Sequence, residues 1–407
     1  MTRKLYIIIP LLVAISTFML FRGWPLLGRQ WLFLSLSLMV IIFAVPGYFK
    51  NSKTFQAIFF YLLVMIFNMV AGDKMFGKPL TIFSDITSLV IPTGLTYYMF
   101  RKGDYKTMTT LIVSFFILLV YTAIASFMID QMNPGIIRYI IEYTNKGGEI
   151  APFMFLFRMG LSNYYLPHAL PVLIPPLFLG IRNNTISKNV RFLLIITLMS
   201  ILLLVFLSGA TTALLLSLIV LVCMLIIRKG LTSRNLITIS LIVAISIPFI
   251  VNQEFLLPFL YGVENVLGES DFTGKVVEFQ DAVAYGEATG DAGVRQSLYE
   301  KSFVAFNENP LLGTNEQIGG HSALLDRLAS FGIIGFIPLL LCFYYHLTSV
   351  LGMLEKKYHI YYYMGVFMCV LMLSLKNMFN WEMMVVSFTI LPISLFVLRK
   401  DYSKKKH

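Results

Sequence analysis

The densest group of residues that could do chemistry lies between Gly293 and Gly335. Within it, the pattern over 294–307 predicts an amphipathic helix, and an Asn-Pro dipeptide directly after the pattern predicts its end. Arg295, Tyr299 and Ser302 are spaced i, i+4 and i+7, so they would share one face of this helix. That face is the first candidate for a functional surface.

A glycine-rich connector then leads to His321 and Ser322, which we expect to open the helix that enters the next membrane span. The free N–H groups and the positive dipole end of a helix start suit an anion. Asp326 lies one turn after Ser322. It could orient His321 or pair with the neighbouring Arg327, and His321 itself could be a catalytic or a structural histidine.

A second group spans 157–168 and contains Arg158, Asn163 and His168. Arg158 interrupts an otherwise apolar stretch. An arginine at membrane depth is costly and usually faces a cavity or a partner, although a long side chain can also extend to the membrane surface. Asn163 and His168 are weaker candidates from the same segment.

Other charged and polar residues give weaker signals. Glu382 lies with Lys376 and Asn380 at the edge of the last predicted helix pair, where it could line a cavity or cap a helix start. Arg138 and Glu142 are four residues apart on a predicted outer segment, which indicates an ordinary surface ion pair.

The sequence predicts no metal site and no cofactor. A group of acids late in the chain lacks coordination spacing and fits a solvated loop; it comprises Glu278, Asp281, Glu287 and Asp291. The cysteines also lack metal-type spacing, and we expect them to be buried small hydrophobes; they are Cys223, Cys342 and Cys369.

The elements that must position these residues are membrane helices. The chain has 407 residues, of which 57% are hydrophobic and only 13% charged, about half the charged share of a typical soluble domain. Apolar runs recur throughout, and each approaches the roughly 20 residues that cross a bilayer. We therefore expect an all-α polytopic membrane protein of about 12 spans, near 5–21, 31–49, 55–71, 80–100, 108–129, 166–181, 192–207, 210–227, 235–252, 332–351, 360–376 and 381–398.

The distribution of charge predicts the orientation. The net charge of +11 would suit nucleic acid, but the basic residues occur as short clusters between apolar runs, so we expect no nucleic-acid partner. When the N-terminus is placed in the cytoplasm, the basic clusters fall in the cytoplasmic loops and the acids fall outside. Both termini, including the basic tail 399–407, are then cytoplasmic.

Besides the basic tail 399–407, three regions follow from this topology. Residues 1–252 would hold nine membrane helices, with a first large outer loop at 130–166 that could contain a re-entrant or interfacial helix. Residues 253–331 would form a large outer loop, which we expect to fold as a helical cap because apolar residues occur throughout it. Residues 332–398 would hold the last three membrane helices.

These features together resemble the bacterial O-antigen polymerase and ligase superfamily. The resemblance rests on an arginine that opens a helix (Arg295), then Phe306-Asn307-Glu308-Asn309-Pro310-Leu311-Leu312-Gly313, then Gly319-Gly320-His321-Ser322, Asp326 and Gly332–Gly335. Arg158-Met159-Gly160 followed by Asn163 resembles the family's first large outer loop. The motifs cover only about 60 residues, and a glycine common eleven positions after each arginine is replaced by Ala169 and Phe306.

The resemblance implies a metal-independent glycosyltransferase of the C-type membrane class, located in the bacterial inner membrane with its active site on the outer face. Its substrate would be undecaprenyl-diphosphate-linked oligosaccharide, and a chain-length regulator and a flippase would be its partners. Arg158 and Arg295 would bind the diphosphate, because a guanidinium matches phosphate oxygens. His321 would be the base or a second phosphate contact, and further substrate contacts would come from Tyr299, Asn163, Ser322, Asp326 and Glu382.

Three functions share this pattern. A polymerase would move the growing glycan onto an incoming lipid-linked repeat unit, to build O-antigen, capsule or exopolysaccharide. A ligase would move the finished glycan onto lipid A core. A transporter or flippase would move the lipid-linked substrate between leaflets without changing it. The Gly-Gly-His-Ser motif followed by Asp326 favours the polymerase.

Overall fold

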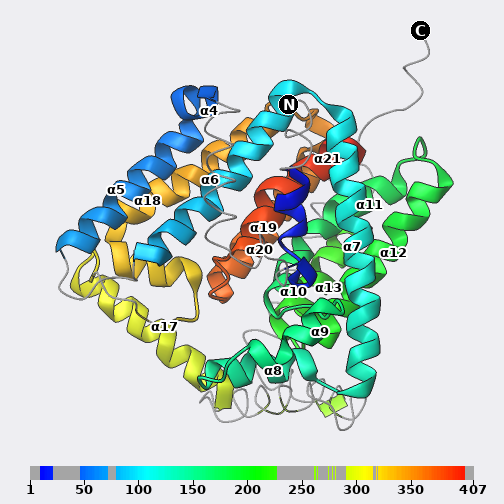
Figure 1. The fold of residues 1–407 in the computed structure, drawn as a ribbon. Helices are drawn as coiled ribbons and strands as arrows, with labels where there is room; N and C mark the ends of the chain where they lie inside the picture. The colour runs from blue at the N-terminus through cyan, green and yellow to red at the C-terminus, as the bar shows by residue number, and fades with distance from the viewer. Residues whose placement is uncertain are drawn as a thin grey trace.

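The computed structural model describes residues 10–21, 46–71, 79–226, 290–314 and 320–398, with a few single positions between 261 and 280 and at 318. Every regular element in these ranges is helical (Figure 1). Five helices there are long and apolar enough to cross a membrane. They are α7 (Tyr105–Met132), α12 (Lys188–Leu207), α18 (Ala323–Leu351), Lys356–Leu375, which includes α19 (His359–Leu375), and Trp381–Leu398.

The other predicted spans have different outcomes. Two are shorter apolar helices within α5 (Lys53–Ala71) and α13 (Thr211–Ile226). The fourth is α6 (Pro79–Lys102), of 24 residues, which is not among the five. Residues 31–45 and 235–252 lie outside the described part of the chain, and 46–49 belong to α4 (Pro46–Asn51). The total of about 12 spans therefore stays a prediction.

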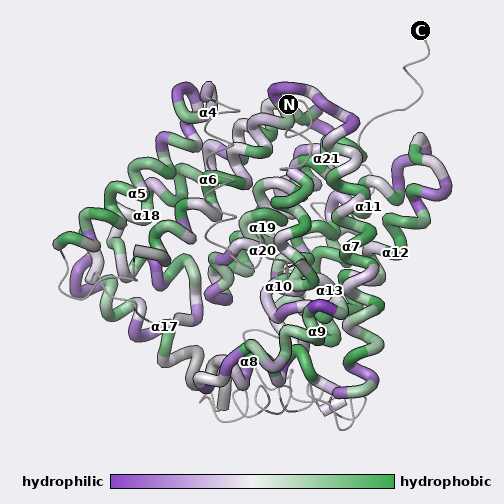
Figure 2. Tube along the Cα trace, in the orientation of Figure 1, coloured by the Kyte–Doolittle hydropathy of each residue, from purple (hydrophilic) through white to green (hydrophobic). Residues whose placement is uncertain are grey.

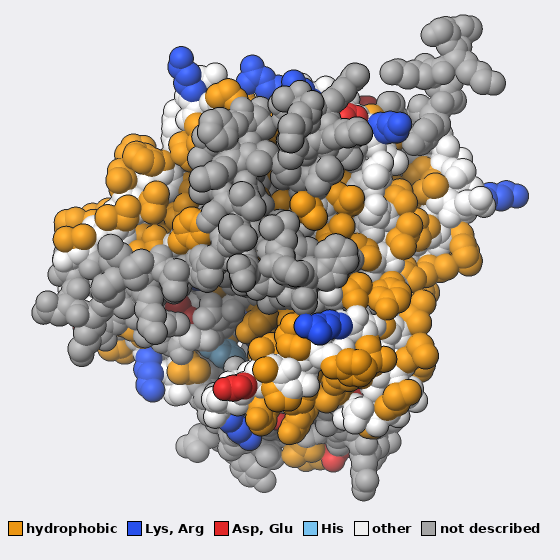
Figure 3. All heavy atoms as spheres, in the orientation of Figure 1, with side chains coloured by type: hydrophobic (Ala, Val, Ile, Leu, Met, Phe, Trp, Pro, Cys, Tyr) orange, Lys and Arg blue, Asp and Glu red, His pale blue; other side chains and the backbone are white. Residues whose placement is uncertain are grey.

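The described residues form a hydrophobic middle between two polar ends (Figure 2). Large apolar side chains such as Phe59, Phe127 and Phe206 point outward and are about half exposed, as expected for helices that face lipid. Lys and Arg side chains lie along the upper edge of the face in Figure 3. Contacts at this end include Tyr105 with the carbonyl of Val397 (2.9 Å) and Asn183 with that of Leu398 (2.9 Å).

The last span, Trp381–Leu398, is almost completely enclosed by other helices. It consists of α20 (Trp381–Val385), the π-helical turn η6 (Val386–Ile390) and α21 (Leu391–Leu398). A π-turn shifts the backbone hydrogen-bond register, and α6 braces it here. Thr96 donates to the carbonyl of Phe388, and Thr389 donates to that of Pro92 at 3.0 Å.

The predicted span at 166–181 is not one regular helix. It divides into α10 (Tyr165–Ala169), η3 (Leu170–Leu173) and α11 (Ile174–Arg182). Four prolines explain the divisions, because each lacks an N–H and disfavours a helical residue before it; they are Pro167, Pro171, Pro175 and Pro176. The segment is nonetheless buried in the core over 166–180.

Helix α18 is broken at Gly332, whose backbone angles are φ 60° and ψ −170°. The turn 309–314 fits into this break. The Pro310 and Leu311 carbonyls accept hydrogen bonds from the N–H groups of Ile333 (2.9 Å) and Ile334 (3.1 Å). The turn thereby caps the second half of the helix. The predicted span at 332–351 thus begins at the break, while the helix itself begins nine residues earlier.

The first outer loop contains short helices at the lower end of Figure 1, namely α8 (Ile136–Asn145), η2 (Ala151–Phe153) and α9 (Met154–Arg158). Arg138 and Glu142 form the expected i, i+4 ion pair at 2.8 Å. The apolar part of this loop, 152–159, is thus helical for only one or two turns, and whether it is re-entrant or interfacial stays a prediction.

Candidate functional site

Helix α17 (Gly290–Glu308) carries the first group of candidate residues and ends directly before Asn309-Pro310, as predicted. The Tyr299 hydroxyl donates to the carbonyl of Leu375 at 2.9 Å, and the Ser302 hydroxyl donates to Asp326 Oδ1 at 2.8 Å. These bonds tie α17 to α19 and α18. Arg295 belongs to α17, but its side chain lies outside the described residues.

The expectation that α17 is amphipathic is wrong over its described side chains. Phe303 and Val304 are both more than half exposed, while the polar Ser302 is fully buried. Ser302 can be buried because its hydroxyl is hydrogen-bonded to Asp326. The buried face of α17 is therefore selected by specific polar contacts rather than by an apolar stripe.

The Asp326 carboxylate organises the turn that carries His321. Its Oδ2 accepts a hydrogen bond from the N–H of Gly320 at 2.9 Å, and its Oδ1 accepts the bond from Ser302. Ser322 caps α18, since its hydroxyl oxygen accepts from the N–H of Leu325 at 3.1 Å. The His321 ring lies 6.0 Å from that of Tyr299, centroid to centroid.

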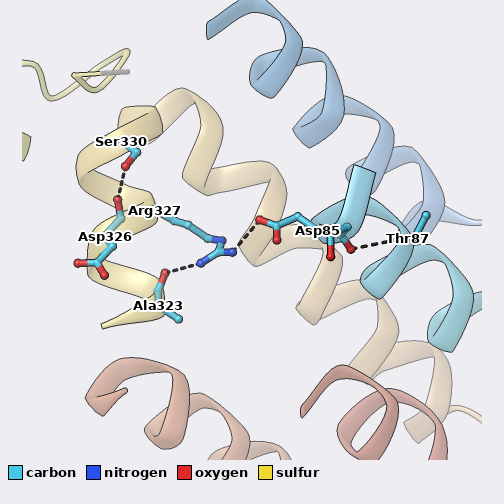
Figure 4. Close-up of polar contacts among 7 residues, drawn as sticks. Asp85, Thr87, Ala323, Asp326, Arg327 and Ser330 are labelled. Carbon is cyan, nitrogen blue, oxygen red and sulfur yellow. Dashed lines mark hydrogen bonds and ion pairs between the residues drawn. The ribbon is translucent and has the colours of Figure 1, made fainter. Parts of the chain in front are cut away.

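Asp326 does not pair with its neighbour Arg327, which corrects one of the two sequence alternatives. The two side chains leave α18 in different directions (Figure 4). Arg327 binds Asp85 of α6 at 2.7 Å, donates to the carbonyl of Ala323 at 3.2 Å and lies over the ring of Phe379 at 3.7 Å from its centroid. Because Asp85 and Arg327 are both buried, the pair fixes the first turn of α18 against α6.

The non-helical segment 376–380 between α19 and α20 lies beside these groups. The Lys376 carbonyl accepts a hydrogen bond from the N–H of Ala323 at 3.1 Å, one residue after Ser322. The Lys376 side chain is only 8% exposed, and its charge is close enough to interact with the fully buried His168. The backbone of Lys376 therefore lies next to the start of α18, and its side chain is buried.

Asn163 and Glu382 join the two distant candidate segments. Asn163 Nδ2 donates to Glu382 Oε1 at 2.7 Å, and Asn163 Oδ1 accepts from the N–H of Leu166 at 2.8 Å. Glu382 is 2% exposed. The cap of α20 is Asn380, whose side chain accepts from the N–H of Met383 at 2.9 Å, so capping is not the role of Glu382.

The contacts described above form one cluster, made by Asn163, Tyr299, Ser302, Gly320, Ala323, Asp326, Leu375, Lys376 and Glu382. Arg158 lies apart from this cluster. It is exposed at the end of α9 and forms no hydrogen bond or ion pair with the described part of the chain. His168 is buried, and its Nδ1 lies 2.9 Å from the carbonyl of Tyr164. The geometry therefore brings Asn163 and His168 toward the cluster and leaves Arg158 at the surface.

A cavity of about 380 Å³ adjoins Asn163. Its wall is mostly apolar and includes side chains of α8 and α9, while Asn163 and Ser162 supply polar groups. Its lining comprises Met19, Ile137, Ile140, Ile141, Thr144, Gly148, Ile150, Phe157, Ser162, Asn163, Tyr164 and Tyr165. A mostly apolar pocket with few polar groups is typical of a small-molecule or lipid site.

The cluster offers acid–base groups, hydroxyls and a buried cation at one end of the helical bundle. Within the described residues, no group of three His, Cys, Asp or Glu side chains could hold a metal ion. Sequence reasoning missed the contacts of Lys376, Arg327 and Phe379, because nothing in their spacing links them to Ser322 or Asp85.

No protein-family model matches this chain, and no curated protein sequence matches it significantly.

Proposed function

We propose that this chain is a polysaccharide polymerase that transfers a glycan from undecaprenyl diphosphate to an incoming lipid-linked oligosaccharide. The supporting observation is that three segments converge on residues 375–382 at one end of the bundle. Asn163 from the first outer loop contacts Glu382, Tyr299 contacts Leu375, and the N–H of Ala323 contacts Lys376. A site at a membrane surface, beside apolar helices, suits a substrate that has a polar glycan and a lipid tail.

The reaction needs two kinds of group. The acceptor hydroxyl oxygen attacks the anomeric carbon of the donor sugar while the bond from that carbon to the diphosphate oxygen breaks. The diphosphate leaves with the electron pair, so cations must stabilise its charge. The acceptor proton passes to a base, and a histidine near neutral pH suits that task.

We assign His321 as the base, held in place by the bond from Gly320 to Asp326, and Arg295 as a diphosphate ligand. Lys376 joins this assignment as a second cation, since it is buried next to the start of α18. Arg158, exposed on α9, would reach the diphosphate only from the rim. Tyr299, Asn163 and Glu382 would contact the glycan, and Ser322 and Asp326 would shape the turn.

This proposal places the protein in the bacterial plasma membrane with the cluster on the outer face and both termini in the cytoplasm. Lys and Arg side chains lie along the upper edge of Figure 3, and others lie lower on the same face; under the positive-inside rule the upper end would be cytoplasmic. A chain-length regulator and a flippase that supplies substrate would be its partners.

The test is reconstitution in nanodiscs with an authentic undecaprenyl-diphosphate oligosaccharide alone, with products resolved by mass spectrometry. We expect a ladder of longer lipid-linked glycans. His321→Ala, Arg295→Ala and Lys376→Met should each reduce its yield by about 100-fold or more. Arg138→Ala, in an exposed ion pair at the same end, is the control and should leave the ladder unchanged.

Other results would point to other functions. If no ladder forms but glycan is transferred to added lipid A core, the protein is a ligase. If neither product forms while substrate moves between leaflets of a vesicle, it is a transporter. A normal ladder from His321→Ala and Arg295→Ala would refute the assigned site.

A further inference from the structure

A second cavity, of about 490 Å³, lies at the basic end, between α7, α12 and α21. Its wall is largely aliphatic and aromatic, and includes Ile112, Val113 and Phe116 of α7 and Val190, Leu193 and Leu194 of α12. None of these residues belongs to the cluster at the opposite end. The function proposed above therefore does not account for this cavity.

The depth of the cavity matches one leaflet of a bilayer. Along α7 its lining runs from Tyr105 to Phe116, which at 1.5 Å per residue is about 16 Å. Half of the hydrocarbon core of a bilayer is about 15 Å. The cavity thus extends from the membrane surface to about the midplane, alongside the chains of lipids in a single leaflet.

Three of the four hydroxyl groups that line the cavity already donate a hydrogen bond; the fourth, Ser187, accepts one from the N–H of Val190 at 3.4 Å. The Tyr105 hydroxyl donates to the carbonyl of Val397 at 2.9 Å, the Thr109 hydroxyl to that of Tyr105 at 2.8 Å, and the Thr185 hydroxyl to Asn183 Oδ1 at 2.7 Å. Each hydroxyl has one proton to donate. A polar ligand would find few donors here, whereas a hydrocarbon chain would lose nothing.

The chain segments that adjoin the cavity lining are basic, since Lys106 follows Tyr105 and Lys188 follows Ser187, and we take this end as the mouth of the cavity. The connecting segments 101–106 and 182–191 together hold six Lys or Arg residues and one acid, Asp104. The carboxylate of Asp104 caps α7 through the N–H (3.1 Å) and hydroxyl (2.6 Å) of Thr107. Lys106 and Lys188 are exposed in the first turns of α7 and α12, where the helix dipoles are also positive. This end favours a negative charge.

We propose that this cavity binds one acyl chain of an anionic glycerophospholipid, with the phosphate of the headgroup at Lys106 and Lys188. The apolar wall, the depth of one leaflet and the basic mouth together select a lipid that is long, apolar and negatively charged at one end. Val397 and Leu398 also line the cavity, so the lipid would pack against the end of the last span, Trp381–Leu398. The proposal does not rest on the glycosyltransferase function.

Native mass spectrometry of the purified protein provides the first test, with phosphatidylglycerol and phosphatidylcholine of identical chains as competing probes. We expect one phosphatidylglycerol to be retained selectively. Val190→Trp fills the cavity and should abolish retention. Phe192→Trp lies on the same helix but is 66% exposed outside the lining, and it should retain the lipid.

The charges are tested separately. Lys106→Gln/Lys188→Gln should reduce the preference for phosphatidylglycerol by about 30-fold, the equivalent of about 1 kcal/mol for each lysine. Equal retention by Val190→Trp and Phe192→Trp, or no headgroup preference in the unmodified protein, would overturn the proposal.

A measurement on the unmodified protein removes any dependence on how the variants fold. Phosphatidylglycerol with a photoreactive group in its acyl chain should label the peptides around 109–116 and 190–194. Labels spread evenly over the lipid-facing helices would contradict a specific site.

Discussion

The segment from α17 to Gly320, which carries Arg295 and Tyr299 and leads to His321, contacts α18 in two places. The two contacts use different chemistry. At the break in α18, the turn 309–314 bonds through main-chain atoms, as in the pairs Ile333–Pro310 and Thr314–Ala329. At the first turn of α18, the contact is made by the Asp326 carboxylate with Ser302 and Gly320.

The difference separates residues that main-chain packing requires from residues that are held by a side-chain carboxylate. Main-chain contact at the break demands glycine on both sides, because a Cβ on Gly313 would lie 2.3 Å from the Ser330 oxygen and one on Gly332 2.3 Å from the Leu311 oxygen. The glycine of the Asn-Pro-x-x-Gly motif is thus explained by packing. The contact at Asp326 instead fixes Gly320, the residue before His321.

Removing the main-chain contact should have the largest effect. Gly332→Ala adds a Cβ that overlaps the opposing backbone at a residue whose φ and ψ are essentially restricted to glycine. We expect a loss of more than about 4 kcal/mol, seen as failure to recover folded protein in size-exclusion chromatography. Gly103→Ala is the control, because Gly103 also has positive φ (61°) but open space around its Cβ position. Similar losses in both variants would show that φ, not contact, decides.

The next largest effect should come from the pair of Arg327 with Asp85, on the side of α18 that faces α6. Arg327→Met leaves the buried Asp85 carboxylate without its cation and should cost about 3 kcal/mol, measured by thermal unfolding in detergent. Asp85→Leu/Arg327→Met removes both charges and should recover most of that loss. Arg138→Met, which breaks an exposed pair, should cost less than about 1 kcal/mol. A double variant no more stable than the single one would refute a simple charge-pair role.

The smallest effect tests whether Asp326 acts by geometry or by charge. Asp326→Ala leaves the N–H of Gly320 without its acceptor and should cost about 1–3 kcal/mol. Asp326→Asn can still accept from Gly320, and its amide can donate to Ser302, whose one hydroxyl proton can then go to the carbonyl of Leu298, 3.2 Å away. We therefore expect near-normal stability and polymer formation from Asp326→Asn. Loss of the ladder in a normally stable Asp326→Asn would instead assign a role to the charge.

Local patterns predicted several elements correctly. The end of α17 at Asn309-Pro310, the helix start after Ser322 and the Arg138–Glu142 pair follow from rules that act within one or two helical turns. The division of 166–181 was missed, although its four prolines were visible, because hydropathy reports apolar length and not backbone regularity.

Contacts between distant segments could not be predicted in the same way. Asp326 and Arg327 are adjacent, and the sequence left their pairing open, yet the partner of Arg327 is Asp85, 242 residues away in the sequence. Asn163 and Glu382 are 219 residues apart. Which partner a buried polar group finds depends on how helices pack, and one sequence carries no signal of that packing.

The sequence by itself determined a helical chain with apolar membrane helices, because hydrophobicity acts through local composition. The tertiary structure alone decided that the central span is Trp381–Leu398, that Lys376 lies beside the start of α18, and that Gly313 and Gly332 meet. Those outcomes depend on steric fit and on the pairing of buried polar groups, which arise only when segments far apart in the chain are brought into contact.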